Sequence, residues 1–77
     1  MIYYKNSERK LFAKKINASV TKMAIVNMLG QIAYELNNVS QDELNNGITM
    51  PNVASGAYVA YFRTDTNQVL TKKIIIN

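Results

Sequence analysis

Few residues in this chain have the types and spacing that chemistry requires. The sequence contains neither histidine nor cysteine, which removes the commonest general base and the thiolate ligands of metal sites. Asp42-Glu43 is the one acidic pair, and no third ligand stands at a spacing typical of calcium or zinc sites. The serines and threonines have no histidine partner, and no glycine-rich phosphate loop is present. We therefore predict that the protein is not an enzyme and holds no metal or cofactor.

The chemistry that remains is recognition by charge and shape. The net charge is +4, and five of the nine basic residues lie between Lys5 and Lys15. Such a cluster is typical either of a surface for an anionic partner or of a solvated hairpin in which lysine protects a sheet edge. We favour the hairpin, because no arginine-rich or aromatic-basic motif of nucleic-acid binding accompanies the charge.

The last residues combine charge with a strongly apolar pattern. Leu70-Thr71 leads into two lysines and three isoleucines. Two functions are compatible with such a strand. Either its lysines protect an exposed edge from aggregation, or a partner recognises the strand through an acidic groove or by strand addition. The candidate recognition residues are Lys72, Lys73, Ile74, Ile75 and Ile76.

Composition indicates one small domain. The 77 residues, 48% of them hydrophobic, predict a single folded domain over residues 1–77, near the size at which one core is only just sufficient. Apolar runs are far shorter than the ~20 residues of a membrane helix, so no membrane insertion is expected. Met1-Ile2-Tyr3-Tyr4 lacks the basic start and apolar centre of a secretory signal. An exported form would therefore take that signal from a longer parent chain.

Frequent turn signals divide the sequence into short strands. Turn-forming residues separate the apolar runs at Asn6-Ser7-Glu8, Asn45-Asn46-Gly47, Met50-Pro51-Asn52 and Asp65-Thr66-Asn67. This spacing is typical of an all-β sandwich or barrel.

A hairpin is predicted in the last third of the chain. Asp65-Thr66-Asn67 would form its turn, and Val69–Ile76 is rich in the β-branched residues that strands favour. Side chains of its first strand would alternate between two faces. One face would carry Tyr58, Ala60 and Phe62, and the other Val59, Tyr61 and Arg63.

The segment Ser19–Leu36 fits two structures. Its apolar residues fall at helical spacing and Ser19 would cap such a helix, but Gly30 in the middle would cost roughly 1 kcal/mol relative to alanine. The alternative is a strand at Val20–Asn27, a tight corner at Leu29-Gly30, and a strand at Gln31–Leu36 that ends at Asn37-Asn38. Periodicity alone favours neither structure.

Three motifs in register resemble a known family. They are Asn27-Met28-Leu29-Gly30-Gln31, Val53-Ala54-Ser55-Gly56-Ala57-Tyr58 and Thr71-Lys72-Lys73-Ile74-Ile75. Their order and spacing, from about Lys10 to Asn77, resemble the C-terminal sorting domain of the type IX (Por) secretion system, and the type A form more closely. Val26 stands where that family usually has an aromatic residue, and Val53 where it has leucine. Tyr4-Lys5-Asn6-Ser7 lacks both prolines of the family's usual opening.

The resemblance implies a fold, a role and a set of partners. The fold would be a compact, immunoglobulin-like antiparallel β-sandwich of about seven short strands. The domain would be an export signal on an N-terminal passenger protein, which reaches the periplasm through its own signal peptide. An outer-membrane translocon would recognise the domain, a barrel shuttle would receive it, and a surface sortase would cleave it off. The passenger would then be anchored at the cell surface or released.

The motif residues have structural roles in this interpretation. Gly30 would supply a positive φ or close packing at a strand corner, and Gln31 would hydrogen-bond the loop backbone. Gly56 before Tyr58 is similar to a tyrosine corner, in which the phenol bonds nearby backbone. The full set of structural motif residues is Asn27, Leu29, Gly30, Gln31, Gly56 and Tyr58.

Two functions of other classes are also compatible with the sequence. A free-standing adhesive or carbohydrate-binding β-sandwich would share only the fold, and it predicts a cluster of exposed aromatic residues. A small DNA-binding protein would use Ser19–Leu36 as a helix. The adhesive or carbohydrate-binding module is the alternative to an export signal, and we expect no nucleic-acid partner.

Overall fold

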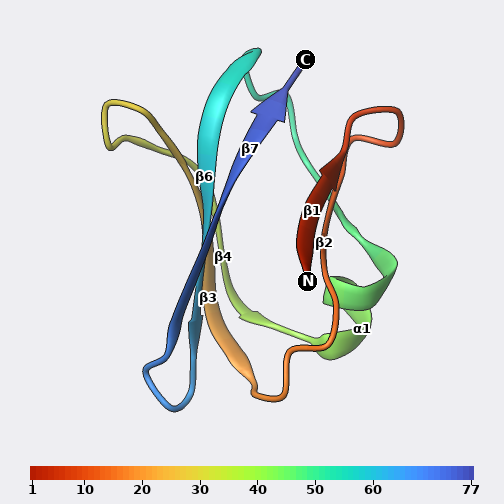
Figure 1. Cartoon of the computed structure of the whole chain (residues 1–77), viewed down its shortest axis with the longest axis vertical. Coiled ribbons are helices and arrows are strands. Elements are labelled where there is room, and N and C mark those ends of the chain that lie inside the picture. The colour runs from red at the N-terminus through yellow and green to blue at the C-terminus, as the bar shows by residue number, and fades with distance from the viewer.

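Two antiparallel sheets pack face to face (Figure 1). The computed structural model describes residues 1–77. The smaller sheet has the order β1-β2-β5 and consists of β1 (Ile2–Lys5), β2 (Lys10–Ala13) and β5 (Ile48–Thr49). The larger sheet has the order β4-β3-β6-β7 and consists of β3 (Val20–Asn27), β4 (Ile32–Val39), β6 (Gly56–Thr64) and β7 (Val69–Ile76). The prediction of an all-β sandwich of about seven short strands is confirmed.

The core fills the space between the sheets, and β6 shows how the sequence pattern builds it. Tyr58, Ala60 and Phe62 are buried, whereas the side chains between them are half-buried or exposed, as the alternation predicts. Phe62 is 0% exposed and pairs with Met23 of β3, which is also fully buried. Burying a side chain of this size stabilises the fold by about 1.5–3 kcal/mol, so the centre of the larger sheet holds the sandwich together.

Ser19–Leu36 forms two strands, and the helix alternative is wrong. The apolar side chains reach the core by strand alternation, with Met23 opposite Leu36 and Ile25 opposite Tyr34. β4 also runs further than expected, so the prediction that Asn37-Asn38 ends the strand is wrong. Its last residue, Val39, is only 5% exposed and pairs with Val20. This burial favours continuing the strand, and Asn38 within it has φ +52, a conformation that asparagine tolerates.

A short helix, α1 (Gln41–Asn46), was not predicted. Its first turn carries a capping box, in which the Ser40 hydroxyl accepts from the Glu43 N–H at 3.1 Å and the Glu43 carboxylate accepts from the Ser40 N–H at 3.2 Å. Leu44 points into the core and is fully buried. The acidic pair Asp42-Glu43 therefore lies at a helix start, where carboxylates are stabilising, and this position gives the pair a structural role.

Candidate recognition site along the β7 edge

The structure gathers no group of three or more acidic, histidine or cysteine side chains that would hold a metal ion. None of its helices has the length and apolar character needed to cross a membrane. The tyrosines are dispersed over several strands, and none of the strongly exposed large apolar side chains is aromatic. Tyr3 stacks on Phe12 with ring centroids 4.9 Å apart, which is packing between neighbouring strands. The cluster of exposed aromatics that a carbohydrate-binding surface requires is not formed.

β7 is an edge strand, and its side chains alternate between the two faces of the larger sheet. Ile74 and Ile76 are 5% and 4% exposed, and they pack in the core. Lys72, Lys73 and Ile75 are exposed, with Ile75 at 53%. The five candidate recognition residues are therefore divided: two anchor the strand, and three remain accessible in the folded domain.

The backbone of β7 alternates as well, and hydrogen bonds identify which residues face outward. The Thr64 N–H of β6 donates to the Gln68 carbonyl at 2.9 Å, so the even-numbered residues of this segment turn their backbone toward β6. The odd-numbered residues turn theirs to the free edge. Asn6, in the turn between β1 and β2, covers the end of that edge by donating to the Ile75 carbonyl at 3.1 Å and accepting from the Asn77 N–H at 2.9 Å.

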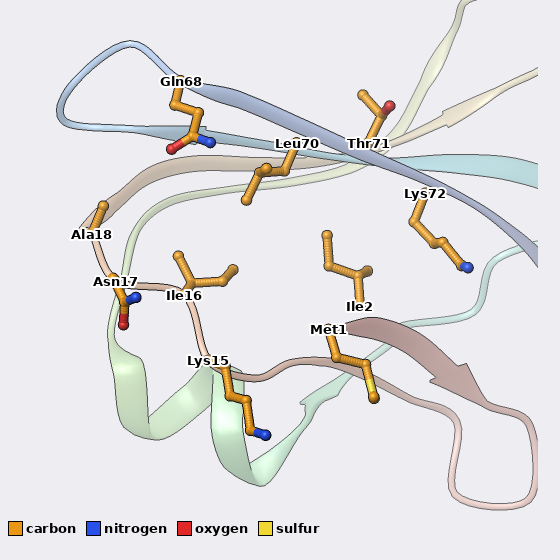
Figure 2. Close-up of a pocket in the computed structure, with 10 residues that line it drawn as sticks. All are labelled: Met1, Ile2, Lys15, Ile16, Asn17, Ala18, Gln68, Leu70, Thr71 and Lys72. Carbon is orange, nitrogen blue, oxygen red and sulfur yellow. The ribbon is translucent and has the colours of Figure 1, made fainter.

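A crevice opens between the facing edges of the two sheets, beside the first half of β7 (Figure 2). It has a volume of about 560 Å³, within the range of ligand pockets. Ile2, Ile16 and Leu70 point toward one another and form its apolar wall (Figure 2). The crevice exists because β1 has four residues and β7 has eight, so β1 covers only part of β7.

A second, smaller crevice of about 270 Å³ continues along the same edge as far as Asn6 and Ile75, and Lys72 lines both spaces. Together the two crevices form what we term the edge groove. Its charged side chains are Lys15, Lys72 and Lys73, and no carboxylate lines it. The groove is therefore apolar at its base, basic at its rim and bordered by the outward backbone of β7.

The Asn27–Gln31 motif forms the corner between β3 and β4, and Asn27 organises it. The Asn27 side-chain oxygen accepts from the N–H groups of Leu29 and Gln31, each at 2.9 Å, and its amide donates to the Gln31 side-chain oxygen at 2.9 Å. Gln31 thus bonds the Asn27 side chain, whereas we expected a bond to loop backbone. Gly30 has φ +84 with open space around it, so conformation and not close packing requires glycine here. Leu29 is 85% exposed.

The Gly56–Tyr58 motif lies at the start of β6. The Tyr58 hydroxyl donates to the Ala54 carbonyl at 2.6 Å, which is the bond that defines a tyrosine corner. In the sheet register Tyr58 lies between Asn27 of β3 and Ile74 of β7. The three sequence motifs therefore meet in one row across the larger sheet, although 47 positions separate the first of these residues from the last.

The basic cluster between Lys5 and Lys15 is divided among several local contacts. Lys5 forms an ion pair with Glu8 at 2.9 Å. This hydrogen bond and charge raise the pKa of Lys5 and lower the pKa of Glu8. Lys14 lies over the rings of Tyr3 and Phe12. Lys5 and Lys10 lie opposite each other in the register and share the outer face of the hairpin formed by β1 and β2 with Lys14, whereas Lys15 is the one member of the cluster that lines the edge groove.

Comparison with known proteins gives one family match. The sequence profile of the family described as secretion system C-terminal sorting domain matches residues 5–77. No curated protein matches the chain. The matched region begins in β1 and contains all three motifs, the whole of β7 and most of the edge groove.

Proposed function

We propose, because this chain belongs to the secretion system C-terminal sorting domain family, that β7 is the element by which the export machinery recognises it. The family comprises sorting signals of the type IX secretion system and is not a family of enzymes. Such a domain implies an N-terminal passenger protein, the type IX machinery, and delivery to the cell surface or beyond.

The proposed route has four steps. The passenger's own signal peptide brings the protein to the periplasm, where the domain folds. An outer-membrane translocon binds the folded domain, and a barrel shuttle receives it. A surface sortase then cleaves the domain from the passenger, which is joined to an anionic lipopolysaccharide or released. In this route the domain is a substrate of the sortase.

The observation that carries the proposal is the display of Lys72 and Lys73 on an edge strand of a folded sandwich. The structure has two ion pairs, Lys5 with Glu8 and Lys22 with Glu35, so both lysines of β7 are without an acidic partner. A carboxylate on a partner protein would form an ion pair with either lysine without breaking an existing ion pair. Ile74 and Ile76, which follow the two lysines in β7, are buried and hold the strand in place.

The test is export of a reporter fused in front of this domain in a type IX-competent cell. Deleting Lys72–Asn77 would also remove two core isoleucines, so a sharper variant is Lys72→Ala with Lys73→Ala. The control is Lys10→Ala with Lys14→Ala, which removes the same charge from positions that are in neither ion pair and do not line the edge groove. We expect surface reporter to be lost in the β7 variant and retained in the control. Equal export by both double variants would refute recognition through β7.

A further inference from the structure

The free edge of β7 has the form of a template for another strand. Val69, Thr71 and Lys73 turn their backbone outward, because the same alternation that places Ile75 against Asn6 places them on that side. β7 pairs with β6 alone, so the N–H and C=O groups at these three positions have no partner in the chain. An unpaired row of this kind accepts an extended segment through main-chain hydrogen bonds. Asn6 limits that row to the first part of the strand.

The edge groove would receive the side chains of such a segment. A strand added beside β7 extends the larger sheet, and every second side chain then turns toward the smaller sheet. At this position those side chains meet the wall of Ile2, Ile16 and Leu70, which is only partly buried in the structure. The added strand would cover apolar surface that β1 is too short to cover.

The charge of the groove indicates the chemistry of the segment. Three lysines line the groove and no carboxylate balances them, so acidic residues beside the apolar ones would be favoured. A second copy of this chain is disfavoured as the occupant, because pairing two β7 edges would bring Lys72 and Lys73 of each copy close together.

We propose that an extended segment of a type IX export component pairs with the outward backbone of β7 at residues 69–73. Apolar side chains of this segment fill the edge groove, and an acidic side chain meets Lys72. This inference rests on the proposed function and specifies how the partner engages the strand: through the backbone and the groove as well as through the lysine charges.

The first test replaces Thr71 with proline. Thr71→Pro removes an outward N–H and places a ring on the free edge, but it keeps the bonds between β6 and β7 because these come from the even-numbered residues. We expect the variant to fold, as measured by thermal unfolding of the purified chain. In the fusion we expect surface reporter to fall to the level of a reporter without this domain.

The second test fills the groove and leaves β7 unchanged. Ile16 lies on the connection between β2 and β3 and points into the edge groove. The larger side chain of Ile16→Trp would fill the part of the groove that the partner's side chains would enter. The matched control is Ala33→Trp, which adds the same bulk at an exposed position of β4. We expect Ile16→Trp to lose export and Ala33→Trp to keep it, with both chains folded. If Thr71→Pro is unfolded, this pair decides the question.

The outcomes separate the two proposals. Loss of export in Lys72→Ala with Lys73→Ala, together with normal export by a folded Thr71→Pro or Ile16→Trp variant, overturns strand addition and leaves the proposed function standing. Failure of the unmodified fusion to reach the surface overturns both. Loss of export in the folded edge and groove variants, with export retained by Ala33→Trp, supports strand addition.

Discussion

Replacing Tyr58 by phenylalanine isolates one hydrogen bond at the place where the three motifs meet. The Tyr58 hydroxyl donates to the Ala54 carbonyl at 2.6 Å, and Tyr58 is 7% exposed. Phenylalanine keeps the ring and its packing against the core, so the substitution opens no cavity. In the unmodified chain this hydrogen bond connects the loop before β6 to the larger sheet, at the position where Tyr58 lies between Asn27 and Ile74.

The expected cost follows from the surroundings of the bond. A neutral hydrogen bond contributes about 0.5–1.5 kcal/mol net to the free energy of unfolding. Ala54 is exposed, so water can replace the phenol at its carbonyl, and the penalty of a buried unsatisfied group does not apply in full. We therefore expect Tyr58→Phe to destabilise the chain by about 1 kcal/mol, which lowers Tm by about 4–8 °C in a domain of this size.

Thermal unfolding of the purified chain, followed by circular dichroism, measures this change. Tyr61→Phe is the matched control, since the Tyr61 hydroxyl is bonded to the exposed Arg63 side chain at 3.1 Å. The control is expected to stay within about 0.5 kcal/mol of the unmodified chain. Equal Tm values for Tyr58→Phe and the unmodified chain, or an equal loss in both variants, would refute the assignment of a tyrosine corner.

Three further predictions concern Gly30 in the β3–β4 corner, Gly47 at the end of α1, and the ion pair between Lys5 and Glu8. Gly30→Ala is expected to cost about 1–2 kcal/mol, because its φ of +84 is strained for alanine although the space is open. Gly47→Ala is expected to cost more, because its φ is +97 and the new Cβ would lie 2.8 Å from the Phe12 ring; urea unfolding measures both. Glu8 has a lowered pKa, so its pair with Lys5 stabilises the fold at neutral pH and is lost as the pH falls through that pKa. Any Tm difference between Glu8→Gln and the unmodified chain should therefore disappear in acid, and a difference that persists there would exclude the ion pair as its cause.

The sequence predicted the elements in which local chemistry and burial agree. In the last hairpin, β-branched residues, a polar turn and strict alternation all favour the same structure, and the structure has it. The segment Ser19–Leu36 was ambiguous because its apolar residues satisfy the helical period as well as the strand period. Burial on the sheet decided between the two structures, and burial is a property of the complete fold.

α1 was missed although its signal is visible in the sequence. Ser40 and Glu43 stand at the spacing of a capping box, and Leu44 supplies the buried contact. The helix has only six residues, too few to show a helical period, so the cap was the one available sign. Gly47 is constrained by the Phe12 ring from a distant strand, a contact that no local pattern reveals.

The edge groove could not be predicted, because it depends on which strands become edges and on how long they are. The sequence indicated that Lys72–Ile76 forms a strand, but not that β7 lies beside β1 or that β1 is too short to cover it. Only the assembled sandwich brings Ile2 and Ile16 beside Leu70.

Alternation along β7 gives one short sequence two separate roles. Ile74 and Ile76 fix the strand in the core, and this fixed position sets the direction of Lys72, Lys73 and the outward backbone. A flexible tail with the same residues would lose conformational entropy when it binds a partner. An edge strand has already lost that entropy on folding. If β7 is the recognised element, as proposed, the domain is expected to be recognised in its folded state, with its core residues holding the edge in one geometry.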